Sequence, residues 1–485
     1  MLKILFVKPQ NKIILKLATP PLGIMYISSY LRQYLKEDIR IKIIDNRLYG
    51  YNEEQLCQRI KEYNPSIVGI SSITVEDGDM HAAARAAKRF NRKIVVIAGG
   101  HHPTQYYDEV IMDRNIDALV LGEGELTFLE LVQNYMSGKG YDGVKGIAFR
   151  MDDQVVRAPE RELMPDLDLI PFPAWDLIDM KAYFRVLSMS GILGYRKYMS
   201  ILTSRGCSYE CIYCHGLFGK NFRARSVEDV GREIDALVSR YGIYKLEILD
   251  DIFNLDYKRA QGILDFIISR SYKLKLSFPN GLRGDLLDYN ILLKLKKAGT
   301  IACGVAMESA SSRIHNMIKK ELDINKTEEM VRMSSRLGML TGSAFMLGFP
   351  GETREEMLST INMAVKSELD LAYFFIVIPF KGTPLFEENK MMIAEKYKNV
   401  PFSDYNYFRG VFNLSSVSDK EFIKIQQMAY LRFYLYPRRI LRILSKYLSF
   451  ERGICSLVSN FLMMFIFIFL RRLDKAHLKA KKDAL

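Results

Sequence analysis

The stretch "SRGCSYECIYCHG", residues 204–216, holds three of the chain's six cysteines at a C-x3-C-x2-C spacing. So few cysteines in 485 residues do not make a disulfide framework; they indicate a reducing compartment, where clustered cysteines bind metal or do redox chemistry. Structural zinc would need a fourth ligand, and His215 adjoins Cys214 too closely to close the same tetrahedron. Three thiolates on an iron–sulfur cubane leave one iron open for a substrate or cofactor. The spacing therefore favours a cluster held by Cys207, Cys211 and Cys214.

The cysteine loop follows the first of six apolar stretches that alternate with helical segments over residues 196–400. These stretches are "YMSILTS", "KLEILDD", "KLSFPN", "IACGVAMES", "LTGSAFMLGFP" and "LAYFFIVIPF". Six such units predict an open or partial parallel (β/α)6 barrel, whose catalytic face is formed by the carboxyl ends of its strands. The cysteine loop is therefore expected on that face.

Residues 1–150 show a similar alternation and predict a doubly wound, Rossmann-like α/β domain. Strands are expected at "KILFVKP", "IKIIDN", "IVGISS", "IVVIAGG" and "ALVLGEG". Ligands of such domains lie at the carboxyl ends of the strands, where Gly99-Gly100 and Gly122-Glu123-Gly124-Glu125 cluster. Neither cluster is a dinucleotide fingerprint. Residues 151–195, with three prolines in "MPDLDLIPFPAWDLID", are expected to form an extended linker.

The cysteine loop resembles the signature of radical S-adenosylmethionine (SAM) enzymes, in which an aromatic residue, here Tyr213, commonly precedes the third cysteine. "LEILDDIF", "GVAMESAS" and "GFPGET" resemble later segments of that family. "TPPLGIMYISSYL", "GGHHPT" and "GEGELTFLEL" resemble the subfamily with an N-terminal cobalamin-binding domain. The resemblance implies a [4Fe-4S] cluster, SAM and cobalamin, a small-molecule or lipid substrate, and an electron donor such as flavodoxin or ferredoxin.

The resemblance also implies binding residues. Those expected near SAM are Tyr213, Asp250, Asp251, Glu308, Ser309, Gly348 and Gly351. The first loop lacks the Asp-x-His of cobalamin proteins that ligate cobalt through histidine, so cobalamin binding is expected to rest on backbone and polar groups. These are Ser71, Ser72, Thr74, Gly99, Gly100 and Glu123. No catalytic acid, base or nucleophile is predicted.

Several charged and imidazole groups have a plainer interpretation. His81 is expected near a helix start, away from cobalt, and His101 and His102 in a surface loop. Asp250 and Asp251 fit a solvated strand end as well as a SAM contact. Glu308 lies inside an apolar strand and needs a polar partner. The cations expected on helix surfaces, any one of which could meet the SAM carboxylate, are Arg313, Lys319 and Lys320.

The tail, within the helical C-terminal region 401–485, carries most of the net charge of +13. From Leu431 to Leu485, twelve Lys and Arg face three acidic residues, a balance of +9. This distribution argues against a nucleic-acid groove in the main domains and for an anionic surface near the tail. Residues 429–448 predict a basic amphipathic helix. Ile454–Leu470 is apolar, and predicts either a buried helix over the barrel mouth or a membrane anchor.

The sequence thus predicts a cobalamin-dependent radical SAM enzyme that methylates an unactivated carbon of an apolar or lipid-like substrate. A cyclase or oxidoreductase without methyl transfer is the alternative within the same class. A zinc-stabilised protein that binds a membrane surface is the alternative from another class. The expected location is the cytoplasm, with peripheral attachment to the inner face of the membrane if the tail is an anchor.

Overall fold

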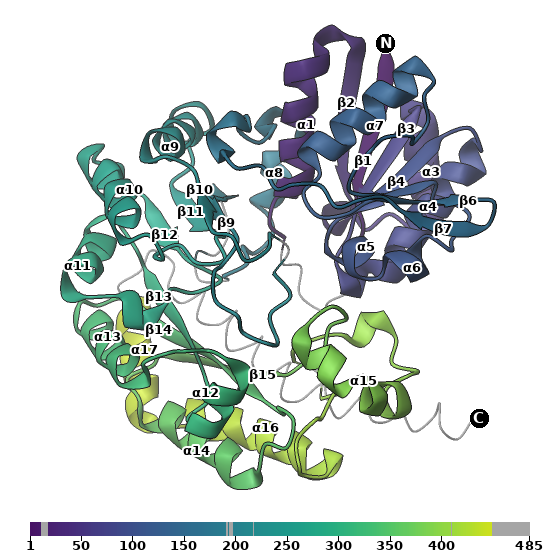
Figure 1. Cartoon of the computed structure of the whole chain (residues 1–485). Coiled ribbons are helices and arrows are strands. Elements are labelled where there is room, and N and C mark those ends of the chain that lie inside the picture. Colours follow the sequence, from purple (N-terminus) through teal and green to yellow (C-terminus); the bar gives the residue numbers. More distant parts are fainter. Residues whose placement is uncertain (11–17, 191–192, 194–196, 217, 409, 449–485) are drawn as a thin grey trace.

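A computed structural model describes residues 1–485 except 11–17, 191–192, 194–196, 217, 409 and 449–485. Two α/β units dominate it (Figure 1). The first, drawn in purple and blue, is built on one mixed sheet, and the second, drawn in teal and green, curves as an open barrel. The predicted fold class is confirmed.

The first unit is a seven-stranded sheet in the order β2-β1-β3-β4-β5-β6-β7. Its strands are β1 (Leu2–Lys8), β2 (Ile39–Asp45), β3 (Ile67–Ser71), β4 (Val95–Gly99), β5 (Ala118–Val120), β6 (Ile147–Met151) and β7 (Gln154–Arg157). The five predicted strands are all present and run parallel. The antiparallel hairpin β6–β7 was not predicted and continues the sheet beyond residue 150.

Helices cover both faces of this sheet, as the near-continuous apolar strands require. They are α1 (Leu22–Leu35), α2 (Asn46–Tyr49), α3 (Glu53–Tyr63), α4 (Asp77–Phe90), α5 (His101–Gln105), α6 (Tyr107–Val110) and α7 (Glu125–Ser137). Helices α1 and α7 pack against one face, and α3 and α4 against the other. The carboxyl ends of β3, β4 and β5 remain directed toward the second unit.

The second unit contains all six predicted barrel strands, in two parallel three-stranded sheets. The first sheet holds β8 (Tyr198–Ile201), β11 (Lys245–Ile248) and β12 (Lys275–Ser277), and the second β13 (Ala302–Glu308), β14 (Leu340–Leu347) and β15 (Leu371–Ile376). Single bridges such as Leu282 to Val305 connect the two sheets. A short antiparallel pair, β9 (Ser204–Arg205) with β10 (Arg223–Ala224), frames the cysteine loop.

Helices surround the barrel and connect it to the first unit. They are α8 (Met180–Tyr183), α9 (Val227–Tyr241), α10 (Tyr257–Ser269), α11 (Tyr289–Lys297), α12 (Ser312–Ile318), α13 (Ile324–Arg336), α14 (Arg354–Lys366), α15 (Pro384–Lys396), α16 (Asp419–Tyr434) and α17 (Pro437–Leu448). The linker packs Trp175, which is 5% exposed, into the core of the first half-barrel. The linker is therefore part of the packed structure rather than a loose connection.

The prediction of one basic amphipathic helix over residues 429–448 was wrong. Proline is tolerated in the first turn of a helix but not in its interior, so the chain stops at Tyr434 and starts α17 at Pro437. Ile443 of α17 packs with Ala302 and Leu340, which begin β13 and β14. Helix α17 therefore covers the end of the barrel opposite the cysteine loop. Ile454–Leu470 lies outside the described residues, and no helix within them is long and apolar enough to cross a bilayer.

Candidate active site

The cysteine loop leaves the carboxyl end of the first barrel strand, where the sequence placed it. Gly206 has a φ of +83°, and a Cβ there would lie 2.3 Å from the Asn221 carbonyl oxygen, so only glycine fits this turn. The Cys207 amide donates to Gly219 and the Cys214 amide to the Cys211 carbonyl. These bonds fold the loop back on itself.

All three thiols line one cavity of about 280 Å³ at the barrel mouth, together with Asp251 and Lys320. Burial raises the pKa of Cys207, and it raises the pKa of Cys214 to about 11 although this side chain is exposed to the cavity. Free thiols here would stay protonated at neutral pH, and thiolates would need a positively charged centre. The donor set fits a cluster of several irons, one for each sulfur.

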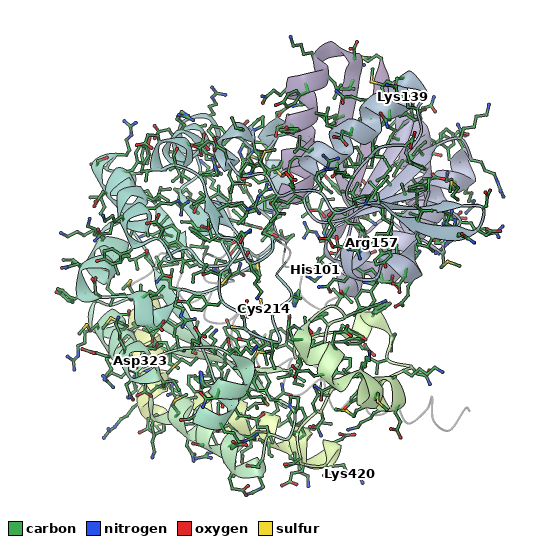
Figure 2. All side chains as sticks on the ribbon, in the orientation of Figure 1. His101, Lys139, Arg157, Cys214, Asp323 and Lys420 are labelled. Atoms are coloured by element: carbon green, nitrogen blue, oxygen red, sulfur yellow. The ribbon has the colours of Figure 1, made fainter. Side chains whose placement is uncertain are left out.

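A mononuclear metal fits less well. Among the residues that the structure describes, no three His, Cys, Asp or Glu side chains surround a single metal position. Burial lowers the pKa of His215 to about 3, so this ring is neutral, and its carbonyl oxygen accepts a hydrogen bond from His101 Nε2 at 2.8 Å. Figure 2 shows His101 and Cys214 close together at the centre of the molecule. This geometry disfavours the zinc-stabilised alternative.

The two aspartates after β11 have different environments. Asp250 is 2% exposed and accepts hydrogen bonds from the Thr203 amide at 2.6 Å and from Ser204 Oγ at 2.7 Å. It therefore fixes the base of the cysteine loop and does not reach the cavity. Asp251 lines the cavity and accepts from the Gly206 amide at 3.1 Å. Only Asp251 is placed to contact a ligand.

Glu308 has the polar partners that its position in an apolar strand requires. Its Oε1 accepts from Tyr213 Oη at 2.9 Å and from Lys320 Nζ at 3.0 Å. The residue is 4% exposed with a φ of +60°, and its Oε2 has no hydrogen-bond partner among the described residues. A buried carboxylate oxygen without a partner in a strained backbone is typical of a ligand site. Lys320 is therefore a site residue, and its predicted surface position was wrong.

The other cations and SAM-site candidates lie away from the cavity. Arg313 pairs with Glu356 on the surface, and Lys319 is exposed, as predicted. Ser309 is fully buried, and its hydroxyl lies 3.2 Å from Thr360 Oγ1. Gly348 has a φ of +93°, and a Cβ there would lie 2.8 Å from the Phe422 ring; Gly351 donates to the Leu414 carbonyl. The structure thus places Ser309, Gly348 and Gly351 in packing roles around the fifth strand.

The polar residues expected to hold cobalamin gather at the carboxyl ends of β3 and β4. Ser72 donates its amide to the Gly99 carbonyl, and its carbonyl accepts from the His102 amide. Gly100 has a φ of +93°, and a Cβ there would lie 2.8 Å from the Ser72 oxygen and 3.0 Å from Ser71 Oγ. Thr74 is 4% exposed, and its hydroxyl has no partner among the described residues. The site therefore has a close-packed backbone floor and one unpartnered donor.

The histidines near this floor have protein partners. His81 lies in α4, with Nδ1 at 2.6 Å from Asp113 and Nε2 at 3.3 Å from Asp77. Both ring nitrogens are thus engaged, which agrees with the expectation that His81 does not reach cobalt. His102 is fully buried with Nε2 at 2.8 Å from Asp77, and His101 contacts the cysteine loop. The prediction that His101 and His102 are surface histidines was wrong.

Glu123 lies between the two units and not at a free ligand position. Its carboxylate accepts from Arg205 at 3.1 Å and from Arg223 at 2.8 Å, and Glu125 accepts from Arg205 at 2.6 Å. All four side chains are at most 9% exposed. Burial alone would raise the pKa of Glu123, but the two guanidinium groups lower it. We call these four residues the interdomain clamp. The sequence gave no signal that the arginines flanking the loop would meet Glu123 and Glu125.

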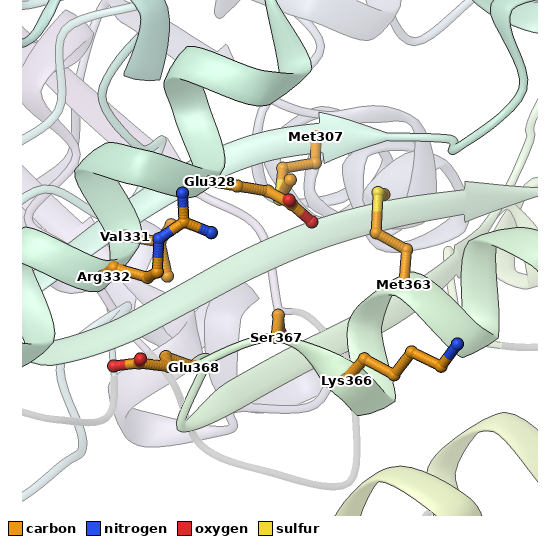
Figure 3. Close-up of a pocket in the computed structure, with 8 residues that line it drawn as sticks. All are labelled: Met307, Glu328, Val331, Arg332, Met363, Lys366, Ser367 and Glu368. Carbon is orange, nitrogen blue, oxygen red and sulfur yellow. The ribbon is translucent and has the colours of Figure 1, made fainter.

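A second cavity, of about 320 Å³, lies on the outer flank of the barrel between α13 and α14 (Figure 3). Its lining includes Glu328, Arg332, Lys366 and Glu368 over Met307. None of the predicted site residues lines it. Its place away from the carboxyl ends of the strands makes it a poor candidate for the active site.

The fold and the site together define an α/β protein in which a Rossmann-like domain faces a thiol loop at the mouth of a partial barrel. The B12 binding domain family matches residues 14–132, and the Radical SAM superfamily matches residues 201–364. An uncharacterized methyltransferase of Pyrococcus horikoshii is 32% identical over 452 residues, which cover 91% of this chain and 94% of the relative. The chain therefore belongs to the cobalamin-dependent radical SAM enzymes, and it uses a [4Fe-4S] cluster, SAM and cobalamin.

Other relatives differ in the reaction that their names state. An anaerobic magnesium-protoporphyrin IX monomethyl ester cyclase of Rubrivivax gelatinosus is 26% identical, with 86% of this chain and 74% of the relative covered. The radical SAM methyltransferase TsrM of Kitasatospora setae, solved with cobalamin and a [4Fe-4S] cluster, has a TM-score of 0.67 at 19% identity, covering 81% of this chain and 76% of TsrM. The similarity to TsrM confirms the arrangement of the fold.

Proposed function

We propose that this enzyme transfers a methyl group to a carbon of an apolar small molecule, with one [4Fe-4S] cluster held by Cys207, Cys211 and Cys214. The observation that carries the proposal is that the three thiols share one cavity, and that this loop contacts the cobalamin-binding unit on both sides. Arg205 lies two residues before Cys207, and His215 follows Cys214 directly. A cluster on this loop and a corrin on the facing strand ends would then lie against the same space.

The cavity residues would bind and orient SAM, whose reductive cleavage at the cluster supplies the radical that abstracts hydrogen. Lys320 offers a cation for a carboxylate, and the free Oε2 of Glu308 offers an acceptor for an amine or a ribose hydroxyl. Tyr213 holds Glu308 in place from the cysteine loop. Asp251 adds a second acceptor at the cavity wall.

The strand ends of the first unit would bind cobalamin through Ser71, Ser72 and Thr74 and through the backbone at Gly99 and Gly100. The close approach of Gly100 to Ser72 leaves no room for a side chain, so a flat corrin could meet the backbone directly. His81 would not ligate cobalt, because two carboxylates already occupy its ring nitrogens. The expected role of Glu123 moves from cofactor contact to the interdomain clamp.

Metal analysis tests the cluster. Anaerobic reconstitution is expected to give about four irons per chain, the content of one cubane. The triple variant Cys207→Ala/Cys211→Ala/Cys214→Ala is expected to lose them all, while Cys57→Ala, on α3 of the first unit, keeps them. About eight irons, or iron retained in the triple variant, would contradict a single cluster on this loop.

Methyl transfer has one rival, because a cyclase is among the relatives. Extracts from cells that lack the enzyme can be incubated with reconstituted protein and SAM carrying a ¹³C-methyl group. We expect the label in a carbon-bound methyl group of one extract component. Deoxyadenosine formation together with an unlabelled product would instead support the cyclase or oxidoreductase.

We also propose that the tail attaches the enzyme to an anionic membrane surface, and that its substrate is lipid-like or apolar. The apolar run Ile454–Leu470 between basic residues supports this, since cations near an anionic leaflet contribute roughly 1 kcal/mol each. Helix α17 contributes less charge than its sequence suggested. Arg439 is 1% exposed, and Arg442 and Lys446 both pair with Asp370.

Flotation with vesicles tests the attachment. The full chain is expected to float with phosphatidylserine vesicles, and a chain that ends at Gly453 to stay below. Because α17 lies opposite the barrel mouth, attachment there would not by itself bring the mouth to the bilayer. A full chain that ignores vesicles, with a truncated chain that aggregates, would show that the segment is core.

A further inference from the structure

The inner face of the second half-barrel carries unusually small side chains. Strand register places Gly304 beside Gly342, and Ala306 beside Ala344, which in turn pairs with Tyr373. Side chains in one row across parallel strands point to the same side of the sheet. Ala306 lines the cysteine cavity. The row Ala306–Ala344–Tyr373 therefore runs from that cavity to the third strand over a low, flat floor.

At the far end of this row stand four aromatic side chains, which we call the aromatic platform: Tyr373, Phe375, Tyr407 and Phe408. The rings of Tyr373 and Phe375 are nearly parallel, 12° apart in plane with centroids 5.6 Å apart. Phe375 also packs against Tyr407 at 5.6 Å and Phe408 at 5.2 Å. Phe374 points the other way, into the core beneath α16. The platform thus belongs to the inner face alone.

The platform is accessible and lies near the cofactor cavity. Tyr373 is 37% exposed although it sits in the middle of a barrel strand, and the other three rings are half-buried. Burial nevertheless raises the pKa of Tyr373, so protein surrounds an opening in front of it. Burial also raises the pKa of Tyr407, and the charges of Cys214 and Glu308 act in the same direction. Tyr407 therefore lies within electrostatic range of the cluster loop.

The chemistry of this surface selects one kind of molecule. None of the side chains in the rows Gly304–Gly342 and Ala306–Ala344–Tyr373, nor in the platform, is ionisable at neutral pH. A flexible alkyl chain needs a narrow groove to bury its surface, whereas the glycine and alanine rows leave a broad floor beside a wall of rings. Aromatic rings bind other rings by offset or edge-to-face contact in addition to area burial.

We propose that the aromatic platform is the substrate subsite of this enzyme, and that it binds a planar, uncharged ring system beside the cofactor cavity. The inference rests on the proposed function and narrows its substrate class from apolar molecules in general to ring systems. An alkyl chain is the competing occupant, and the test distinguishes the two.

The test compares the binding of 1-naphthol and 1-octanol to the reconstituted full chain by calorimetry. Tyr373→Leu and Phe375→Leu keep apolar volume but remove one ring each. Each is expected to weaken 1-naphthol about fivefold, the equivalent of about 1 kcal/mol of ring contact, and to leave 1-octanol unchanged. Tyr34→Leu is the control, because Tyr34 is a 50% exposed ring on α1 of the first unit.

Iron and cobalamin content are measured on every sample, so the two proposals fail separately. Wild-type protein that loads both cofactors but prefers 1-octanol, or whose affinity for 1-naphthol survives both ring removals, overturns the subsite and leaves the proposed function standing. Protein that loads no cluster overturns the proposed function, whereas 1-naphthol binding that depends on Tyr373 still supports the subsite.

Discussion

Removing Arg205 tests whether the interdomain clamp holds the two units together. Arg205 is the one partner recorded for Glu125 within the described residues, whereas Glu123 keeps Arg223. Arg205→Leu therefore leaves a carboxylate that is 7% exposed without a counter-charge. Breaking a buried pair in this way costs roughly 3–5 kcal/mol, because the remaining charge has lost its water and its partner. We expect a loss of that size in the free energy of unfolding.

The assay is urea unfolding of the cofactor-free protein, followed by circular dichroism. Arg32→Leu is the matched control, since Arg32 pairs with Asp176 but both side chains are exposed, and such pairs contribute less than about 1 kcal/mol. The double variant Arg205→Leu/Glu125→Leu removes both charges and should recover part of the loss. A cost for Arg205→Leu no larger than that of Arg32→Leu, or a double variant less stable than the single one, would refute the reasoning.

Two further predictions concern single side chains. Lys320→Met should weaken SAM binding to the reconstituted protein about tenfold or more, because Glu308 loses its cation, while the exposed neighbour Lys319→Met should not; equal affinities in equilibrium dialysis would remove Lys320 from the site. Hydrogen bonds from Asp113 and Asp77 raise the pKa of His81 to about 9, so the stability that it contributes is complete below its unfolded pKa of about 6.5 and is lost as the pH rises through 9. Unfolding of wild type and His81→Gln should therefore differ by about 2 kcal/mol at pH 6 and converge by pH 10, and a difference that does not change with pH would contradict this.

The strands and the cysteine loop could be predicted because their signals are local. Each barrel strand is a short apolar run, and Cys207, Cys211 and Cys214 lie within one loop of the chain. Glu308 could be found for the same reason, since a charge inside an apolar strand needs a partner wherever the strand packs. These features depend on neighbouring residues more than on the final arrangement of the two units.

The partners of charged groups could not be predicted, because they are set by which units meet. Glu123 was expected at cobalamin, but it meets Arg205 and Arg223 from the barrel. Arg439 was expected at the surface, but it donates to backbone carbonyls at the end of α14, including Leu369 and Val365. In both cases the composition is compatible with solvent, and only long-range packing makes the group buried. Contacts distant in sequence are thus where the reading from sequence failed.

The two contacts between the units have one consequence that neither has alone. Arg205 and His215 bracket the three cysteines in the sequence, and each is held from the cobalamin-binding unit, the first by Glu123 and Glu125 and the second through His101. A loop gripped at both ends cannot shift toward or away from the strand ends of the first unit without breaking buried polar contacts. The distance between the cluster loop and the corrin site is therefore set by the packing of the protein. Hydrogen abstraction and methyl transfer at one carbon would need such a fixed distance, because both reagents must reach the same atom.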